Sequence, residues 1–270
     1  MSEVNAAALE GVPVTALWTL WSRASESART DSDFCDFRAE ELCRSIHFDY
    51  RRFGRPAQTQ VLRARTIDAE IERFHRNSPG GTVVALGEGL QTTYWRLGTP
   101  DLNWISVDLP EMIALREQLL PEETRVRTVA ASALDRSWFD LVGSGDVLIT
   151  AEGLFMYLQP DEVYALISDM AQRFPGASVI FDLLPPGLTE RTLKGTKLAR
   201  GSDYVLPPMP FGLTVAQTRA LPQQIPGVSG YQELPMLPGR GWCSPVMLGL
   251  QRRLPLVRNH RHLIARLTFA

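Results

Sequence analysis

The chain has 270 residues, of which 44% are hydrophobic, and its formal net charge is −2. This size and composition suit one large α/β domain, or two small domains, with an ordinary buried core. The near-even charge balance argues against a basic nucleic-acid surface, and no apolar run approaches the roughly 18 residues of a membrane span.

The N-terminal segment and the cysteines indicate the cellular compartment in which we expect the protein. The first eleven residues contain two acids and no basic stretch, unlike a signal peptide. Cys35, Cys43 and Cys243 are too widely spaced to indicate a disulfide framework or a CxxC metal pair. His260 and His262 lack a nearby third metal ligand. We therefore expect a cytoplasmic monomer or homodimer that binds no metal, membrane or nucleic acid.

The first part of the chain is predicted to be helical. Apolar residues recur there at helical spacing, with charged residues between them. The expected helices are Val12–Ala28, Phe37–Ile46 and Arg63–Phe74. The segment Asn77–Gly81, rich in Gly and Pro, should end the third helix. We expect residues 1–80 to form a helical region packed on the rest of the protein.

From Thr82 onward, short apolar runs alternate with longer mixed segments. The expected strands are Val83–Leu86, Trp104–Val107, Val126–Ala130, Val147–Thr150 and Ser178–Phe181. Helices are expected at Glu111–Leu119 and Asp161–Phe174. Because these strands lack polar alternation, both faces should be buried, which indicates a parallel sheet covered by helices.

The C-terminal third departs from this pattern. Pro186–Pro226 is rich in Pro, Gly, Leu and Thr, and it keeps Leu, Met and Phe throughout. We expect it to be a cap-like insertion near the ligand end of a domain spanning residues 81–270. Pro245–Gln251 and His262–Phe269 are predicted to form an antiparallel hairpin that closes the edge of the sheet.

A glycine-rich loop and a later acid indicate a nucleotide site. The apolar run before Gly87 ends in Gly-Glu-Gly, and the next run ends at Asp108. In nucleotide-binding α/β sheets such glycines let backbone approach the ligand, and an acid roughly 20 residues on binds ribose hydroxyls. A tight turn followed by a helix-capping Asp is the alternative reading.

The loop disfavours a dinucleotide. Thr92 occupies the position where a dinucleotide-binding turn needs Gly or Ala, and Glu88 places a negative charge where phosphate would lie. Both features suit a ribose-containing ligand that carries positive charge and no phosphate. S-adenosylmethionine (SAM) meets that description, so an NAD-dependent enzyme is the less favoured reading.

Four stretches resemble the leucine carboxyl methyltransferase family, in particular its bacterial branch associated with polyketide O-methylation. They are Leu62–Asp68 (L-R-x-R-x-x-D), Leu86–Leu97 (L-G-x-G-L-x-T-x-x-x-R-L), Val107–Glu111 (V-D-L-P-E) and Glu152–Leu158 (E-G-L-x-M-Y-L). The resemblance covers roughly residues 12 to 185. It implies a Rossmann-like, seven-stranded class I SAM methyltransferase sheet with added N-terminal helices.

The resemblance also implies roles for particular residues. Arg63 matches an arginine that pairs with the methionine carboxylate, Asp108 the ribose-binding acid, and Glu152 an acid that meets the SAM ammonium. Ser132 and Ala133 fall where the family approaches adenine. Gly87, Glu88, Gly89 and Leu109 complete the expected cofactor-binding set.

Three points stay open from the residues alone. Arg63 could instead pair with Asp68 or Glu70 on its own helix, and Glu152 could cap a helix. The family commonly has Asp where this chain has Gln91. Gln91 could replace it by hydrogen bonding, or Glu88 could supply the missing charge.

Methyl transfer from a sulfonium needs positioning and water exclusion rather than a metal. A carboxylate acceptor needs no base, whereas a phenol or alcohol does. Tyr157, acting through a relay, or a histidine of the C-terminal hairpin is the candidate base. We expect a SAM-dependent O-methyltransferase acting on a small, polyketide-like metabolite. The alternatives are a carboxyl methyltransferase of a protein or peptide C-terminus and a SAM-binding protein without catalytic activity.

Overall fold

The structure is a computed structural model that describes residues 4–5, 9–99, 101–199 and 202–270. A seven-stranded sheet has the order β5-β4-β3-β6-β7-β9-β8. Its strands are β3 (Thr82–Leu86), β4 (Asn103–Asp108), β5 (Val126–Ala130), β6 (Val147–Ala151), β7 (Ser178–Leu183), β8 (Val228–Leu234) and β9 (Leu263–Phe269). β3 to β7 are parallel, while β9 runs antiparallel to β7 and β8. The expected seven-stranded Rossmann-like fold is confirmed.

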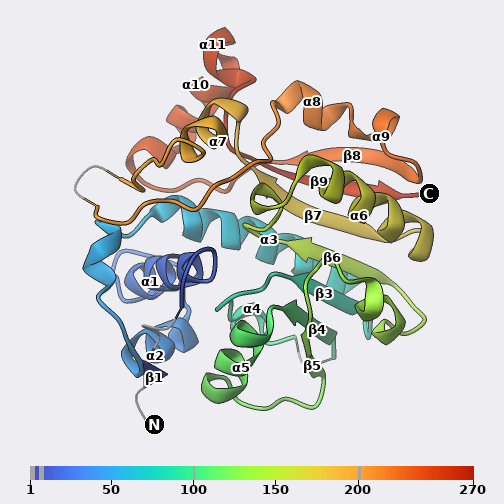
Figure 1. The fold of residues 1–270 in the computed structure, drawn as a ribbon, viewed down its shortest axis with the longest axis horizontal. Helices are drawn as coiled ribbons and strands as arrows, with labels where there is room; N and C mark the ends of the chain where they lie inside the picture. The colour runs from blue at the N-terminus through green and yellow to red at the C-terminus, as the bar shows by residue number, and fades with distance from the viewer. Residues whose placement is uncertain (1–3, 6–8, 100, 200–201) are drawn as a thin grey trace.

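Helices cover both faces of this sheet (Figure 1). They are α1 (Val14–Ser27), α2 (Phe37–Ser45), α3 (Gln58–Asn77), α4 (Thr93–Leu97), α5 (Pro110–Leu119), α6 (Pro160–Arg173), α7 (Pro186–Thr192), α8 (Val215–Arg219), α9 (Leu221–Gln224), α10 (Pro245–Arg253) and α11 (Pro255–Arg258). Short 3₁₀ turns occupy Tyr50–Phe53, Arg136–Leu141, Phe155–Tyr157 and Gly241–Cys243. A two-residue pairing joins β1 (Val4–Asn5) to β2 (Ile46–His47). Among the described residues, no helix has the length and apolarity needed to cross a membrane.

The period of two in β3 explains why both faces are covered. Val84 and Leu86 pack in the core that α6 shares, whereas Val83 and Ala85 pack in the core that α3 shares. All five residues of β3 are buried. Parallel strands read as continuous apolar runs for this reason.

The N-terminal helices form a separate core beside the sheet. Leu17 and Leu20 of α1 pack with Leu42 of α2 and with Met112 and Leu115 of α5. Figure 1 shows α1 and α2 grouped on the same side of the molecule as α5. These helices therefore lie beside the loops and helices that follow the carboxyl ends of β3 and β4.

The predicted hairpin at the C-terminus is wrong in one of its two strands. Pro245–Gln251 lies in α10, and the strand that pairs with β9 is β8. Pro245 occupies the first helical turn, where its preset φ suits a helix, and Leu, Met, Gln and Arg follow it. The sequence did not predict β8. This strand contains Gly230, and its register with β9 is irregular between Val228 and Gly230, so the alternation of apolar and polar residues is weak there.

The segment 186–226 is folded onto the main core. It contains α7, α8 and α9, together with an isolated bridge between Lys197 and Val205. Phe211 and Leu213 are buried in the same core as β7 and α6. The apolar residues that distinguish this segment from a linker are therefore used in packing.

Candidate functional site

The carboxyl edge of the parallel strands holds a cavity of about 540 Å³. Ligands of open α/β sheets bind at this edge, because the loops that follow the strands converge there. All the residues expected at the site line it, namely Arg63, Gly87, Glu88, Gly89, Asp108, Leu109, Ser132, Ala133, Glu152 and Tyr157. The fold therefore brings together side chains from α3 and from the ends of β3, β4, β5 and β6.

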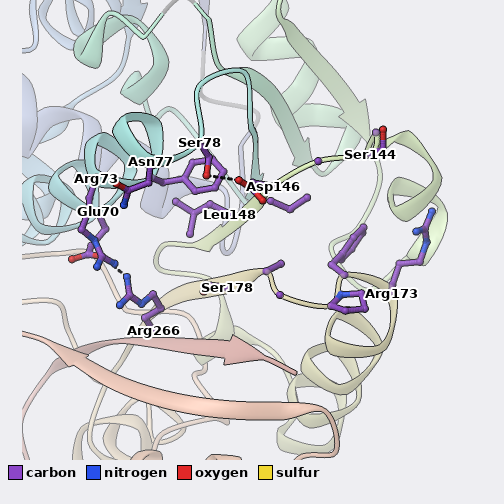
Figure 2. Close-up of a pocket in the computed structure, with 18 residues that line it drawn as sticks. Glu70, Arg73, Asn77, Ser78, Ser144, Asp146, Leu148, Arg173, Ser178 and Arg266 are labelled. Atoms are coloured by element: carbon purple, nitrogen blue, oxygen red, sulfur yellow. Dashed lines mark hydrogen bonds and ion pairs between the residues drawn. The ribbon is translucent and has the colours of Figure 1, made fainter.

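A second hollow of about 550 Å³ lies at the opposite edge of the sheet (Figure 2). Several of its polar side chains bind one another, because Glu70 pairs with both Arg73 and Arg266, and Ser78 donates to Asp146 at 2.5 Å. It lies at the amino ends of β6 and β7, away from the converging loops. We therefore place the functional site at the carboxyl edge.

The glycines of the loop after β3 are required by conformation and by packing. Gly87 has φ +58° and Gly89 has φ +55°, which is the left-handed region that side chains rarely adopt. A Cβ on Gly87 would lie 2.8 Å from Leu154, and a Cβ on Gly89 would lie 3.1 Å from Ala16. The loop thus runs tightly between α1 and the segment that follows β6.

Two buried arginines hold the carbonyl groups of this loop. Arg116 of α5 donates through Nη1 to the carbonyl oxygens of Gly89, at 2.7 Å, and Gln91, at 2.9 Å. Arg23 of α1 donates to the carbonyl oxygen of Leu90 at 2.6 Å. Arginine side chains from two helices, α1 and α5, therefore hydrogen-bond to the loop backbone. These bonds hold the loop in its conformation before any ligand binds.

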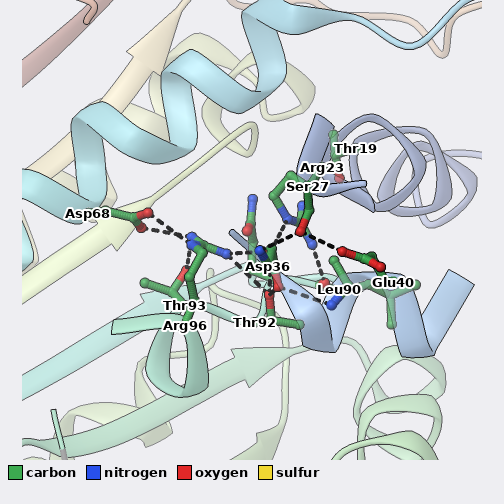
Figure 3. Close-up of polar contacts among 12 residues, drawn as sticks. Thr19, Arg23, Ser27, Asp36, Glu40, Asp68, Leu90, Thr92, Thr93 and Arg96 are labelled. Carbon is green, nitrogen blue, oxygen red and sulfur yellow. Dashed lines mark hydrogen bonds and ion pairs between the residues drawn. The ribbon is translucent and has the colours of Figure 1, made fainter. Parts of the chain in front are cut away.

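Arg23 belongs to a buried ionic network that Figure 3 shows. Asp36, at the start of α2, binds Arg23 at 3.1 Å and Arg96 at 2.8 Å, and Arg96 also binds Asp68 at 2.7 Å. Burial acts to raise the pKa of Asp36, but the two guanidinium groups lower it overall. The network ties α1, α2 and α3 to the loop and the helix after it.

The Glu88 side chain is paired rather than open to a ligand. Its carboxylate lies 2.8 Å from Nη2 of Arg116, and it accepts a hydrogen bond from the indole of Trp104 at 3.1 Å. Burial raises the pKa of Glu88. The charge that we expected to repel phosphate is thus opposed by Arg116, the same arginine that grips the loop.

Asp108 ends β4 and faces the glycine loop. One carboxylate oxygen accepts the Gly89 amide at 2.6 Å, and the other accepts the Leu109 amide at 2.8 Å. Burial raises the pKa of Asp108, although both amide hydrogen bonds oppose that shift. Each oxygen can still accept a second hydrogen bond, which is the bidentate arrangement that a ribose diol needs.

Leu109, Ser132 and Ala133 flank Asp108 in the loops after two neighbouring strands. Leu109 is 38% exposed, an unusual state for a leucine beside a buried strand. Ser132 accepts the Leu134 amide at 3.2 Å, which shapes the turn that follows β5. Leu109 and Ala133 thus give the cavity apolar lining here, and Ser132 adds a hydroxyl group.

Arg63 stands between two buried carboxylates. Its Nε donates to Glu152 at 2.9 Å, and its Nη1 donates to Asp182 at 3.1 Å. Arg63 does not pair with Asp68, which binds Arg96 instead. Glu152 caps no helix, because α6 is capped by Gln159. Both local alternatives that the sequence left open are therefore set aside.

The two carboxylates that share Arg63 shift in opposite directions. Burial, together with the negative charge of Asp182, raises the pKa of Glu152. Burial also acts on Asp182, but Arg63, His262 and the Gly153 amide outweigh it and lower the pKa of Asp182. Glu152 is therefore the member of the pair that takes up a proton first as the pH falls.

Gln91 occupies the position where the leucine carboxyl methyltransferase family, which this chain resembles, commonly has Asp. Its Nε2 donates to Oε1 of Glu152 at 2.8 Å. An aspartate there would add a negative charge beside Glu152, whereas the amide stabilises the ionised carboxylate. Gln91 thus acts by hydrogen bonding, and Glu88 is engaged with Arg116.

Sequence reasoning did not identify Asp182 as a site residue, and it considered His262 only as a metal ligand or as an unassigned histidine of the C-terminal hairpin. Asp182 lies on β7, and His262 precedes β9 at the same edge of the sheet. The His262 Nε2 lies 2.9 Å from Oδ2 of Asp182, and both residues line the cavity. An acid within an otherwise apolar buried strand was the available signal for Asp182.

Tyr157 also lines the cavity, in the turn after β6. Burial raises the pKa of its phenol, although a hydrogen bond with Thr15 opposes the shift. At neutral pH the phenol therefore keeps its proton and can donate a hydrogen bond.

Comparison with known proteins gives three further observations. A family model described as leucine carboxyl methyltransferase matches residues 16–171. Tetracenomycin polyketide synthesis O-methyltransferase TcmP of Streptomyces glaucescens is 30% identical over 97% of this chain and 98% of its own length. The S-adenosyl-L-methionine-dependent methyltransferase dpfgK of Gibberella zeae is 27% identical over 63% of this chain and 64% of its own length.

The fold has a counterpart among solved structures. A DUF574-family protein of Streptomyces avermitilis superposes with a TM-score of 0.56 at 11% identity, over 95% of this chain and 97% of that one. This likeness concerns the arrangement of the sheet and its helices.

Proposed function

Because the chain belongs to the leucine carboxyl methyltransferase family and is a SAM-dependent methyltransferase, we propose that it methylates an oxygen atom of a small, polyketide-like metabolite. The proposal is carried by one feature of the cavity. Its lining combines polar and acidic residues, which include Asp108 and Glu152, with apolar side chains of 186–226, which include Leu188, Leu198, Leu206 and Met209.

The polar and acidic residues of the lining fit SAM. We assign the ribose hydroxyls to Asp108, the ammonium to Glu152, and the methionine carboxylate to the remaining nitrogen of Arg63, Nη2. When bound, SAM supplies an electrophilic methyl group. The acids outnumber Arg63 here, so the site favours a ligand with net positive charge over a pyrophosphate.

The apolar part of the lining supports a small, largely apolar acceptor. Trp18 of α1 and Met156 after β6 add to the apolar walls contributed by segment 186–226. We propose that this segment caps the site, because its side chains line the cavity together with residues that follow the strands of the sheet. A peptide C-terminus, the acceptor of the alternative reading, would need an open groove in that place. The tetracenomycin relative supports a polyketide-like acceptor.

We also propose a cytoplasmic location. All three cysteines are free thiols in the structure, which suits a reducing compartment.

The test is transfer of label from isotopically labelled SAM to hydroxylated and carboxylated naphthalenes, chosen as compact aromatic probes. We expect mass spectrometry to find a methyl group on a probe oxygen and none on a peptide ending in leucine. Methylation of the peptide alone would support the alternative acceptor. SAM binding by calorimetry, without transfer to any probe, would favour a non-catalytic binding protein.

A further inference from the structure

A second, much smaller cavity of about 20 Å³, which we call the inner cavity, lies between α3 and the face of the sheet that α3 covers. It is lined by Ile67 and Ile71 of α3 and by Ala85 of β3, which pack together in the core on that face. Ala85 pairs with Thr150 of the neighbouring strand β6, and Thr150 also lines the inner cavity. The inner cavity therefore lies within the fold, between a helix and two adjacent strands.

Most of the remaining lining is polar and comes from the loops that follow the strands. Glu88 and Gln91 belong to the glycine loop, Thr93 begins α4, and Glu152 follows β6. Glu88, Gln91 and Glu152 also line the cavity at the carboxyl edge. Glu88, Gln91 and Thr93 are buried, so their polar atoms depend on partners inside the protein rather than on bulk solvent.

Two polar groups at the inner cavity have no hydrogen-bond partner among the described residues. Because a carboxylate accepts hydrogen bonds, the Gln91 amide turns Nε2 toward Glu152, at 2.8 Å, which leaves its Oε1 buried and unpartnered. The Thr150 hydroxyl likewise has no partner in the described part of the chain. Thr93 accepts from Arg96 at 3.1 Å, so its hydroxyl proton can serve a further acceptor.

The size and charge of the inner cavity fit a water molecule. A buried water needs roughly 10–15 Å³ of such space and two to four polar partners. About 20 Å³ beside an unpartnered amide oxygen and a hydroxyl group meets both conditions. Glu88 is already paired with Arg116. Glu152 is paired with Arg63, so neither carboxylate at the inner cavity is left to retain a cation.

We propose that one water molecule binds in the inner cavity, donates a hydrogen bond to Oε1 of Gln91 and forms a second hydrogen bond with the Thr150 hydroxyl. The water thereby joins the glycine loop to β6. It holds the Gln91 amide, and that amide in turn donates to Glu152. The effect of the water on SAM binding rests on the function proposed above, in which Glu152 meets the SAM ammonium, but the binding of the water itself does not.

The first test compares two Thr→Val substitutions, which remove a hydroxyl group and keep a similar shape. Thr99 is the matched control, because its hydroxyl is buried without a partner among the described residues and it does not line the inner cavity. We expect Thr150→Val to lower the melting temperature by about 2–6 °C, because the water loses a partner. Thr99→Val should leave it unchanged or raise it. A rise, or no change, in Thr150→Val would mean a dry cavity and would overturn the proposal.

SAM binding tests the link from the water to Glu152. Thr150 does not line the cavity at the carboxyl edge, so its substitution removes no direct contact with a ligand there. We expect calorimetry to show that Kd for SAM rises about three- to tenfold in Thr150→Val, as loss of one hydrogen bond would cause. In Thr99→Val it should stay within about twofold of wild type. A lower melting temperature with unchanged SAM affinity would overturn the link to Glu152.

A crystal structure of the wild-type protein, grown with rubidium as the monovalent cation, tests the occupant directly. We expect a water peak about 2.5–3.2 Å from Oε1 of Gln91 and from Oγ1 of Thr150, without anomalous signal from rubidium. An anomalous peak there would identify a cation site, and it or a cavity without density would overturn the proposal. These measurements use no methyl acceptor, so failure to methylate any naphthalene probe would overturn the proposed function alone.

Discussion

Arg63 and Asp182 lie 119 positions apart in the chain, yet Nη1 of Arg63 is 3.1 Å from Oδ2 of Asp182. The same guanidinium binds Glu152, so one cation serves two buried carboxylates. Buried charges persist in folded proteins only when they are paired. The arrangement ties α3 to the ends of β6 and β7 and places three charges beside the cavity.

Replacing Arg63 with Met should lower the free energy of unfolding by about 3–5 kcal/mol at neutral pH, because two buried carboxylates lose their cation. The pKa values of Glu152 and Asp182 would then rise. The folded variant should take up protons more readily than its unfolded chain, so the deficit should shrink as the pH falls. Urea unfolding at about pH 8 and about pH 5 measures this. The control Arg65→Met removes only an exposed ion pair with Asp33. Equal losses in both variants would contradict the prediction.

Asp108→Ala should weaken SAM binding by about 2 kcal/mol or more, since charged hydrogen bonds to the ribose are lost. Isothermal titration with SAM and with its demethylated product measures the change, and NAD should not bind to either protein. Asp161→Ala, at an exposed position of α6, serves as the control. Unchanged affinity in Asp108→Ala would remove this residue from the cofactor site.

SAM affinity should fall as the pH falls, starting above the ordinary carboxylate range. In the proposed site the ionised forms of Glu152 and Asp108 bind the ligand. Burial raises the pKa of both groups, so protons compete with SAM at a higher pH than they would for an exposed carboxylate. Titrations between about pH 8 and about pH 5 test this. Glu152→Gln should flatten part of the dependence, while Glu190→Gln, at an exposed position, should not. If the wild-type protein binds SAM with the same affinity throughout that pH range, the prediction is wrong.

Gly89→Ala should destabilise the protein more than Gly98→Ala. Both glycines have φ near +60°, at +55° and +59°, so the backbone strain of about 1–2 kcal/mol is shared. Only at Gly89 would the new Cβ meet a neighbour, Ala16 at 3.1 Å. Thermal denaturation compares the stabilities, and calorimetry should show weaker SAM binding in Gly89→Ala alone. If the two variants behave alike, close packing of α1 on the loop is not what selects glycine.

Arg116→Met should weaken SAM binding about tenfold, because the Gly89 and Gln91 carbonyls lose the donor that holds the loop. Glu88→Gln leaves those two hydrogen bonds in place, so its effect on the dissociation constant should be smaller. Arg127→Met, at an exposed position of β5, is the control. Calorimetry on the folded proteins measures all three. A larger effect from Glu88→Gln than from Arg116→Met would mean that Glu88 acts on the ligand directly.

Local patterns were sufficient to predict most elements and to pick out many residues that line the cavity at the carboxyl edge. Each of the strands β3 to β7 could be predicted from a short apolar run of a few residues. Parallel strands that are covered on both faces have such runs. Gly87, Gly89, Asp108 and Glu152 could be placed because each directly follows, or ends, such a run. Pro245–Gln251 was misassigned because a short apolar run does not distinguish a strand from a helix.

The sequence by itself determined the type of sheet, the glycine loop with its acid, and the family, since these depend on residues that are neighbours in the chain. Only the tertiary structure decided that Asp182 and His262, 80 positions apart, meet beside Arg63, and that Arg23 and Arg116 grip the loop from two helices. Such contacts form when β9 inserts between β7 and β8 and when α1 packs on the loop. No local periodicity encodes them, because they depend on chain closure over long sequence separations.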